Sequence, residues 1–517
     1  MPNNSSRWAN LVLSFSILFG AIIRFAPTII SGAPINDGGM FYVMIRDLEL
    51  NHFFIPAFTT YNFQNIPFAY PPFSFYIGGL LNSIGIPIID LIRWLPPIVS
   101  TLSILAFYKL ACLILNSKSK GTLATTAYAL LPRTFSWYVM GGGLSRTFGI
   151  LFLLLACAST WALFTKNEKK YIFPAILFGA GAVLSHPETG LHTAAACVLI
   201  WLFKGRNIRS VWNALLVGVG VFVLISPWWG TVLAQHGFEP FFSALHTGGN
   251  DTLFWIPWVT FDFGEERFVT LFTVLGLLGI VVQSFRRDWF LVTWLLVSFI
   301  VEPRSATAIA AIPLAMLAGI GLSDFVLPNI ENIASKTFDE KRDWTFYMAG
   351  GHAIRLVLGY VLLSALIGGF FYDISLARYV VPAKSRDAMN WIQTNTPPDS
   401  RFIVLTGSGD PFSDPILEWF PTFASRTSQN TIQGKEWLLG SGFMPFLNQI
   451  EILQSCLNDA PSCVENWATT NNISFDYIYI EKSTDRSIPG LLLYELQQDP
   501  EYNQIYTNAD VVIFERK

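Results

Sequence analysis

Asp37 is the residue in this sequence that is hardest to explain by packing alone. It lies in the segment Pro34-Ile-Asn-Asp-Gly-Gly-Met40, directly after the first long apolar run. A carboxylate in this position suits the working group of an enzyme at a membrane surface, and the two glycines allow the backbone to approach a ligand closely. The alternative is a helix N-cap, for which aspartate is a favoured residue. The two roles are compatible, so both interpretations stay open.

Arg146, His186 and Glu188 lie at other predicted membrane boundaries. Arg146 follows a run of three glycines, and it either extends toward the membrane surface or contacts a phosphate. His186 and Glu188 flank Pro187 in a predicted turn between two spans. They either cap the two helices or supply a second acid–base or metal-binding group.

Glu302 and Arg304 flank Pro303 at a further boundary. They form an ion pair that ends a span, or Arg304 binds a lipid-linked phosphate, because an arginine among membrane helices is costly unless it is paired. Tyr70 opens the motif Tyr-Pro-Pro, which is mainly architectural since proline suits the start of a helix.

The composition places all these residues in a membrane protein. The chain has 517 residues, of which 52% are hydrophobic and only 13% charged, whereas soluble domains carry about 25% charged residues. The formal net charge of −3 gives no support for a nucleic-acid partner. We therefore expect a polytopic α-helical membrane protein whose environment includes membrane lipids.

Long apolar runs predict about eleven spans, each near the length that a bilayer crossing needs. The basic residues between them fall in alternate loops, which the positive-inside rule places in the cytoplasm together with the N-terminus. Asp37 and the other candidates are then extracytoplasmic. The predicted spans are 8–30, 92–115, 121–138, 143–165, 171–185, 188–203, 211–234, 267–284, 288–301, 305–325 and 351–373.

Two outer segments are predicted to lie along the membrane. Residues 71–88 are apolar enough to cross, but a crossing would move every later basic loop outside, so we expect a docked helix and eleven to thirteen spans in all. In segment 40–50, Phe41 and Met44 belong to an apolar stripe while Asp47 lies on the polar face. This pattern predicts a helix in the interface plane.

The chain becomes polar from residue 376, which predicts a membrane domain over 1–375 and an extracytoplasmic α/β domain over 376–517. Its cysteines, Cys456 and Cys463, lie seven positions apart, and an oxidising compartment would permit a disulfide between them. Alternating and helical patterns predict strands at 402–405 and 477–480, helices at 386–393 and 491–498, and a terminal hairpin over 502–514.

Two segments could cover a site at the membrane surface. Residues 418–421 and 434–437 fall in a long irregular stretch of the second domain, and long ordered loops are often functional. The outer loop 235–266 is rich in aromatic residues, among them Trp255 and Trp258. These residues belong to an interfacial belt, or they stack on a sugar.

The sequence resembles the GT-C superfamily of integral membrane glycosyltransferases. It is similar to protein O-mannosyltransferases and aminoarabinose transferases around Asn36-Asp37 and Tyr70-Pro71-Pro72, and to oligosaccharyltransferase catalytic subunits from Leu131-Pro132 through Arg146 and in the segment 391–397. The resemblance implies a sugar donor linked to polyprenyl phosphate or pyrophosphate. It also implies that Asp37 acts as a base or a metal ligand.

The resemblance fails at one motif. Oligosaccharyltransferases carry a second acidic motif near residues 143–147, where this chain has Gly-Leu-Ser-Arg-Thr. A metal-independent inverting transfer therefore fits better, with Asp37 as base and Arg304 or Arg146 at the leaving phosphate. No cofactor is firmly implied, and a divalent metal (Mg or Mn) is the less favoured alternative.

Two other functions remain open from the sequence. A transporter or flippase of lipid-linked sugar would carry several charges within its spans, and we count only Lys109. A non-catalytic assembly subunit would tolerate Asp37→Asn. The sequence identifies neither the sugar nor the acceptor, which is a lipid, a protein or a polysaccharide.

Overall fold

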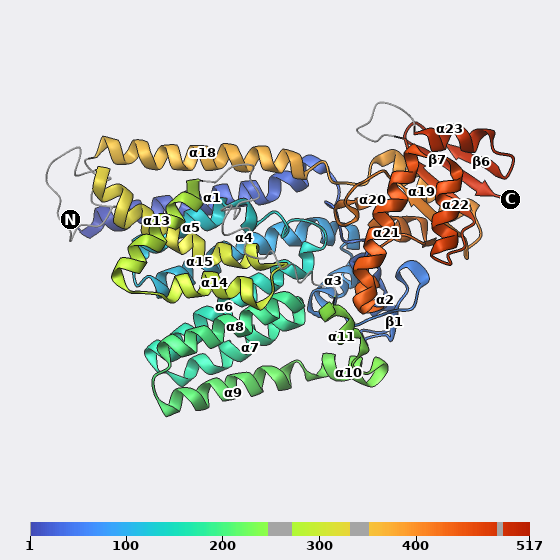
Figure 1. Ribbon diagram of the computed structural model, residues 1–517. Coiled ribbons are helices and arrows are strands. Elements are labelled where there is room, and N and C mark those ends of the chain that lie inside the picture. Colours follow the sequence, from blue (N-terminus) through green and yellow to red (C-terminus); the bar gives the residue numbers. More distant parts are fainter. Residues whose placement is uncertain (1, 247–270, 331–350, 483–489) are drawn as a thin grey trace.

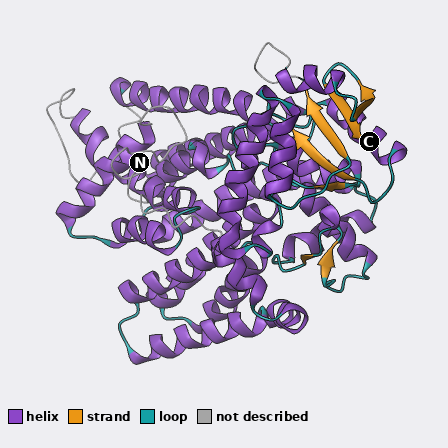
Figure 2. Ribbon diagram, turned by 45° about the vertical axis from the view of Figure 1, so that its right-hand side comes forward, coloured by secondary structure: helices purple, strands orange, loops and turns teal. Residues whose placement is uncertain are grey.

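The computed structural model describes residues 2–246, 271–330, 351–482 and 490–517. Long helices lie side by side in one layered bundle, and a smaller domain that contains the main β-sheet sits at one end of it (Figures 1 and 2). The predicted architecture, a polytopic helical protein with a terminal α/β domain, is confirmed.

The helices of the bundle follow the predicted spans closely. Within the described part of the chain, five are long and apolar enough to cross a membrane, and the pair α9–α10, bent by 52°, would make a sixth. The remaining bundle helices are shorter. All the described helices of the bundle, long and short, are in chain order α1 (Pro2–Ser31), α4 (Ile88–Ile114), α5 (Lys118–Leu130), α6 (Gly143–Lys166), α7 (Ile172–Ser185), α8 (Pro187–Lys204), α9 (Ile208–Leu224), α10 (Ser226–His236), α13 (Leu271–Arg286), α14 (Phe290–Val301), α15 (Ala306–Ile320) and α18 (His352–Leu376).

The span predicted over 121–138 is wrong in its second half. Helix α5 ends at Leu130, and residues 132–134 form a single 3₁₀ turn that begins with a proline. Proline cannot donate the backbone hydrogen bond that would continue the helix. The chain then runs through turns to α6, which frees it to approach the Asp37 loop.

The count of charges within the spans also needs correction. Lys109 lies near the end of α4, whereas Arg24 of α1 and Asp373 of α18 are buried. Arg24 donates hydrogen bonds to Ser100 Oγ (2.9 Å) and Ala129 O (2.7 Å). These bonds give the arginine a structural role in joining α1, α4 and α5, so it does not favour a transport pathway.

Helices α2 (Gly39–Leu50) and α3 (Phe73–Ser83) precede the bundle core. Helix α3 has 11 residues, about 16 Å at 1.5 Å per residue, which is too short to cross a bilayer. On the predicted polar face of α2, Arg46 is exposed, but Asp47 is only 5% exposed. Its carboxylate accepts hydrogen bonds from Thr59 and Thr60, so the side chain fixes the loop after the helix.

The terminal domain is built on a five-stranded sheet of order β4-β3-β5-β7-β6. Strand β3 is parallel to β4 and β5, while β7 is antiparallel to β5 and β6. The predicted strands, helices and hairpin are confirmed. Their bounds are α19 (Ala383–Asn395), β3 (Arg401–Leu405), α20 (Pro415–Ala424), β4 (Thr427–Ser428), α21 (Phe443–Ser455), α22 (Pro461–Thr470), β5 (Tyr477–Glu481), α23 (Leu491–Gln498), β6 (Tyr502–Thr507) and β7 (Val511–Arg516).

Alternate residues of the strands enter two different cores. Phe402 and Tyr479 join a core that continues into Phe41 and Met44 of α2. Ile403 and Ile480 point to the other face, where they pack against α21–α23. Because one core is shared with α2, the terminal domain is packed onto the membrane part and does not hang from a linker.

The stretch expected to be irregular is mostly ordered. Residues 415–424 form α20, which starts where Asp414 accepts hydrogen bonds from Ile416 N and Leu417 N. The structure contains the disulfide Cys456–Cys463. The aromatic residues Trp255 and Trp258 lie outside the described residues.

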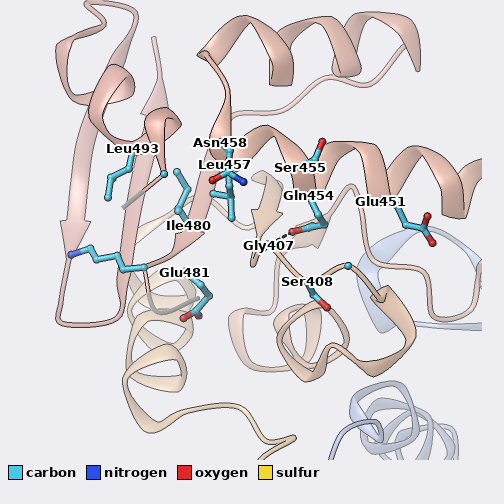
Figure 3. A pocket seen from close by; sticks show the side chains of 13 residues that line it. Gly407, Ser408, Glu451, Gln454, Ser455, Leu457, Asn458, Ile480, Glu481 and Leu493 are labelled. Atoms are coloured by element: carbon cyan, nitrogen blue, oxygen red, sulfur yellow. Dashed lines mark hydrogen bonds between the residues drawn. The ribbon is translucent and has the colours of Figure 1, made fainter. Parts of the chain in front are cut away.

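A polar cavity of about 200 Å³ lies at the carboxyl ends of the parallel strands β3 and β5. Figure 3 shows its side chains, with Gln454 directed at the Gly407 loop. Gln454 Oε1 accepts hydrogen bonds from Thr406 N (2.8 Å) and Gly407 N (3.0 Å). These bonds hold the loop after β3, which continues to Asp410 and Phe412.

Candidate active site

The Asp37 carboxylate is held by the residues that precede and begin α6. Oδ1 accepts a hydrogen bond from Gly142 N (2.7 Å), and Oδ2 accepts one from Arg146 Nη2 (2.9 Å). The N-cap of α2 is Gly38, with φ of 120°, and no side chain caps this helix. Asp37 is therefore not a helix cap, and its side chain faces the bundle.

The glycines before α6 allow this close approach. A Cβ atom on Gly141 would lie 1.9 Å from Asp37 O, and one on Gly142 would lie 2.1 Å from Asp37 Oδ2. Real Cβ atoms do not come this close to other atoms. Glycine is thus required here to bring the backbone of one element onto the carboxylate of another.

A cavity of about 520 Å³ opens beside Asp37, between the bundle and the terminal domain. The structure brings six of the seven predicted site residues to its wall: Asp37, Tyr70, Arg146, His186, Glu188 and Arg304. The seventh, Glu302, does not line it. Residues from the first loop, from four bundle helices or their ends, and from the terminal domain therefore meet at one place.

Arg304 does not pair with the side chain expected. Its Nη1 lies 3.8 Å from Glu188 Oε1, and its guanidinium stacks over Phe412 at 5.5 Å. Glu302 instead accepts hydrogen bonds from Arg304 N (2.8 Å) and Ser305 N (2.7 Å), and it lies near His192. Burial acts to raise the pKa of Glu302, but bonds from His192 and Ser305 lower it to about 2.

His186 and Tyr70 are uncharged members of the wall. His186 caps α8, since its Nδ1 accepts a hydrogen bond from Thr189 N (3.4 Å). Burial, with the nearby positive charges of Arg146 and Arg304, lowers the pKa of His186 to about 3. Burial raises the pKa of Tyr70, whose hydroxyl lies 3.0 Å from Ser145 Oγ. The histidine is therefore not a proton carrier at neutral pH.

Glu418 of α20 is a site residue that sequence reasoning did not identify. It lines the cavity, and its Oε1 accepts a hydrogen bond from Gly38 N (2.8 Å). Burial first, and then the negative charge of Asp37, raise the pKa of Glu418 to about 8. It is thus mainly protonated at neutral pH, so it does not add a full negative charge beside Asp37.

The rest of α20 clamps the loop that carries Asp37. Trp419 Nε1 donates to Asn36 O (2.9 Å), and Thr422 Oγ1 donates to Gly39 O (2.9 Å). The start of α20, Asp414-Pro415, is a recognisable helix signal. Its contact with a loop some 380 positions earlier has no local signal in the sequence.

Further residues of the wall come from segments that were expected only to cover the site. Glu436 and Trp437 line the cavity, and burial raises the pKa of Glu436. Ser243 of α11 (Glu239–His246) donates to Glu436 O (2.8 Å). Arg133 also lines the cavity, near Arg146. The described part of the outer loop 235–266 thus reaches the wall.

No metal-binding group stands out. Among the residues that the structure describes, no three or more His, Cys, Asp or Glu side chains are placed to hold an ion together. This observation does not test the expectation that no cofactor is firmly implied and that a divalent metal is the less favoured alternative.

Comparison with known proteins places the chain in a structural context. Residues 69–230 match the family model for dolichyl-phosphate-mannose-protein mannosyltransferase. None of the curated proteins matches in sequence. The structure of ArnT from Cupriavidus metallidurans bound to undecaprenyl phosphate is similar, with a TM-score of 0.54, 14% identity and 98% of each chain covered.

Two further structures are similar. ArnT from the same organism in the apo state gives a TM-score of 0.54 at 13% identity, again with 98% of both chains covered. Arabinofuranosyltransferase AftD from mycobacteria gives 0.51 at 15% identity; 98% of this chain but 41% of that chain is covered. At such identities the similarity concerns the fold.

Proposed function

We propose that this chain, an integral membrane protein with the GT-C fold of membrane glycosyltransferases, moves a sugar from a polyprenyl-phosphate-linked donor to an acceptor. The observation that carries the proposal is the meeting of a carboxylate and arginines in one cavity between the helical bundle and the terminal domain. The mannosyltransferase family match and the fold shared with a protein crystallised with undecaprenyl phosphate support the donor class.

Asp37 acts in this proposal as the general base. Each carboxylate oxygen accepts one hydrogen bond. Each has a second lone pair, which can accept a hydrogen bond from the hydroxyl group of the acceptor substrate. Asp37 removes the hydroxyl proton as that oxygen bonds to the anomeric carbon. The bond from this carbon to the lipid phosphate breaks on the opposite face, so the configuration inverts and the phosphate leaves with the electron pair.

The two arginines have different roles in the proposal. Arg146 is engaged with Asp37 Oδ2 and also donates to Trp137 O (3.2 Å), so it mainly orients the base. Arg304 is about half exposed, and its contact with Glu188 is long, at 3.8 Å. Its planar guanidinium is suited to two oxygens of the leaving phosphate, and charge there stabilises the transition state.

We also propose that the cavity faces the extracytoplasmic side, with the N-terminus in the cytoplasm. The basic loops between spans alternate with the segments that form the cavity, and short basic loops are retained in the cytoplasm. A cysteine-accessibility assay at introduced cysteines in both sets of loops would test this orientation.

The test of the catalytic proposal compares the purified wild type with Asp37→Asn. The probe is a panel of undecaprenyl-phosphate monosaccharides with membrane-derived acceptors, and the readout is released undecaprenyl phosphate. Loss of a general base costs roughly 10²–10⁴-fold in rate. Asp90→Asn, the same change in the first turn of α4 and outside the cavity, is the matched control and should keep full turnover.

Equal turnover in wild type and Asp37→Asn would refute Asp37 as the base. Binding of the lipid donor without release of lipid phosphate, in every donor and acceptor combination, would favour transport or assembly instead. If Asp37→Asn keeps the function of the wild type in cells, the result would support the alternative of a non-catalytic assembly subunit.

A further inference from the structure

A second large hollow lies at the opposite end of the bundle from Asp37. It is a groove of about 690 Å³ between the ends of α4, α6 and α7. Helix α6 begins beside the Asp37 cavity and ends at Lys166 beside the groove. Its 24 residues span about 36 Å, with the cavity at the first turn and the groove along the last turns, so the groove lies toward the other membrane surface.

The walls of the groove are apolar and open to the membrane. Phe173 and Leu177 of α7 form one wall, and they are 70% and 44% exposed. Ala158 and Ala162 of α6 form the floor, where their small side chains leave room. A site with this lining suits an acyl chain better than a soluble ligand.

Lysines gather at the mouth of the groove. Lys109 of α4, Lys118 of α5 and Lys166 of α6 all line it and are exposed. None of the described residues that line the groove is acidic. Lys166 Nζ lies 3.4 Å from Tyr171 OH, which brings a hydroxyl to the same mouth. The groove therefore joins an apolar slot to a concentrated positive charge.

We propose that this groove binds an anionic phospholipid, with an acyl chain along α7 and the phosphate among Lys109, Lys118 and Lys166. Basic pockets between membrane helices are suited to acidic headgroups. Three positive charges line the groove and no described carboxylate does. An acidic headgroup balances these charges better than a zwitterionic headgroup. The inference does not depend on the proposed transferase activity.

The test measures lipid binding to the delipidated full chain in detergent by native mass spectrometry. The probes are dioleoyl phosphatidylglycerol, dioleoyl phosphatidylcholine and inorganic phosphate. The wild type should prefer phosphatidylglycerol. The triple variant K109Q/K118Q/K166Q should lose roughly 100-fold in affinity for it, the equivalent of about 1 kcal/mol for each lysine near an acidic headgroup.

Two variants make the result specific. R206Q/R209Q/R287Q removes three exposed charges that do not line the groove and should keep the wild-type affinity. K109R/K118R/K166R keeps the charges and should bind normally, which also shows that the positions tolerate change. Equal losses in both glutamine triples, or no preference for phosphatidylglycerol in the wild type, would overturn the proposal. Inorganic phosphate that displaces the lipid at equal concentration would assign the site to free phosphate.

Discussion

Glu418→Gln should remove a pH-dependent loss of stability from this protein. The Glu418 side chain is 4% exposed, and its Oε1 accepts the Gly38 N–H. Burial and the nearby Asp37 charge raise its pKa from 4.5 to about 8. Glutamine is neutral at every pH and keeps an oxygen for Gly38, so the variant resembles the protonated wild type.

The sign of the effect follows from proton binding. Between the unfolded pKa of 4.5 and the folded pKa of about 8, the folded chain holds a proton that the unfolded chain has released. The free energy of unfolding is therefore highest at low pH, falls as the pH rises through this window, and levels off above the folded pKa. Each pH unit within the window costs about 1.4 kcal/mol, so a rise from about pH 6 to 9 costs roughly 3 kcal/mol.

Thermal unfolding of both forms across this range tests the reasoning. With an average unfolding entropy of about 2.1 cal/mol/K per residue, 3 kcal/mol corresponds to about 3 °C in Tm if the chain unfolds as one unit. The difference in Tm between Glu418→Gln and the wild type should therefore be about 3 °C larger at about pH 9 than at about pH 6. Glu451→Gln, on an exposed residue of α21, should follow the wild type. Parallel pH profiles for wild type and Glu418→Gln would refute the assignment of a protonated Glu418.

Further predictions concern the phosphate contact, the glycine approach and the disulfide. Arg304→Ala should raise the donor KM by roughly 10–100-fold, the cost of a lost hydrogen bond to a charged group, and an unchanged donor titration would contradict this. Gly142→Ala should lower kcat by about 10²-fold with little change in Tm, because its Cβ would lie 2.1 Å from Asp37 Oδ2 and displace the carboxylate; normal steady-state kinetics would exclude that displacement. Reduction of Cys456–Cys463, a loop of separation 7, should lower the unfolding free energy by about 2.5 kcal/mol in the chain-entropy model, as measured by denaturant unfolding with and without reductant.

The sequence was sufficient to identify several residues of the cavity wall and to predict that they lie on one side of the membrane. Asp37, Arg146, His186 and Arg304 each follow or begin a helix that the apolar runs predict, and the alternating basic loops place these helix ends at one surface. The apolar runs predicted the helices, and the alternation of basic and non-basic loops predicted the side of the membrane on which the helix ends lie.

Contacts between distant segments could not be predicted in this way. The pattern of α2 identified Asp47 as polar, but only the fold shows that Thr59 and Thr60 bury it. Glu418 falls in a stretch that the sequence predicts to be irregular, and its partner Gly38 is 380 positions away. Local periodicity tells which face of a helix is polar, and it does not tell which distant group will pair with that face.

The geometry of Asp37 depends on the terminal domain as much as on the bundle. Gly38 has φ of 120°, a conformation that glycine adopts readily but does not prefer strongly. The loop is fixed because α20 binds it through Gly38 N, Asn36 O and Gly39 O, while Gly142 and Arg146 hold the side chain from the bundle. The membrane part alone supplies the carboxylate and its arginine, and the terminal domain supplies the bonds that fix the backbone between them. The two parts are therefore one structural unit at the cavity, and a substitution on α20 is expected to act on Asp37 without touching it.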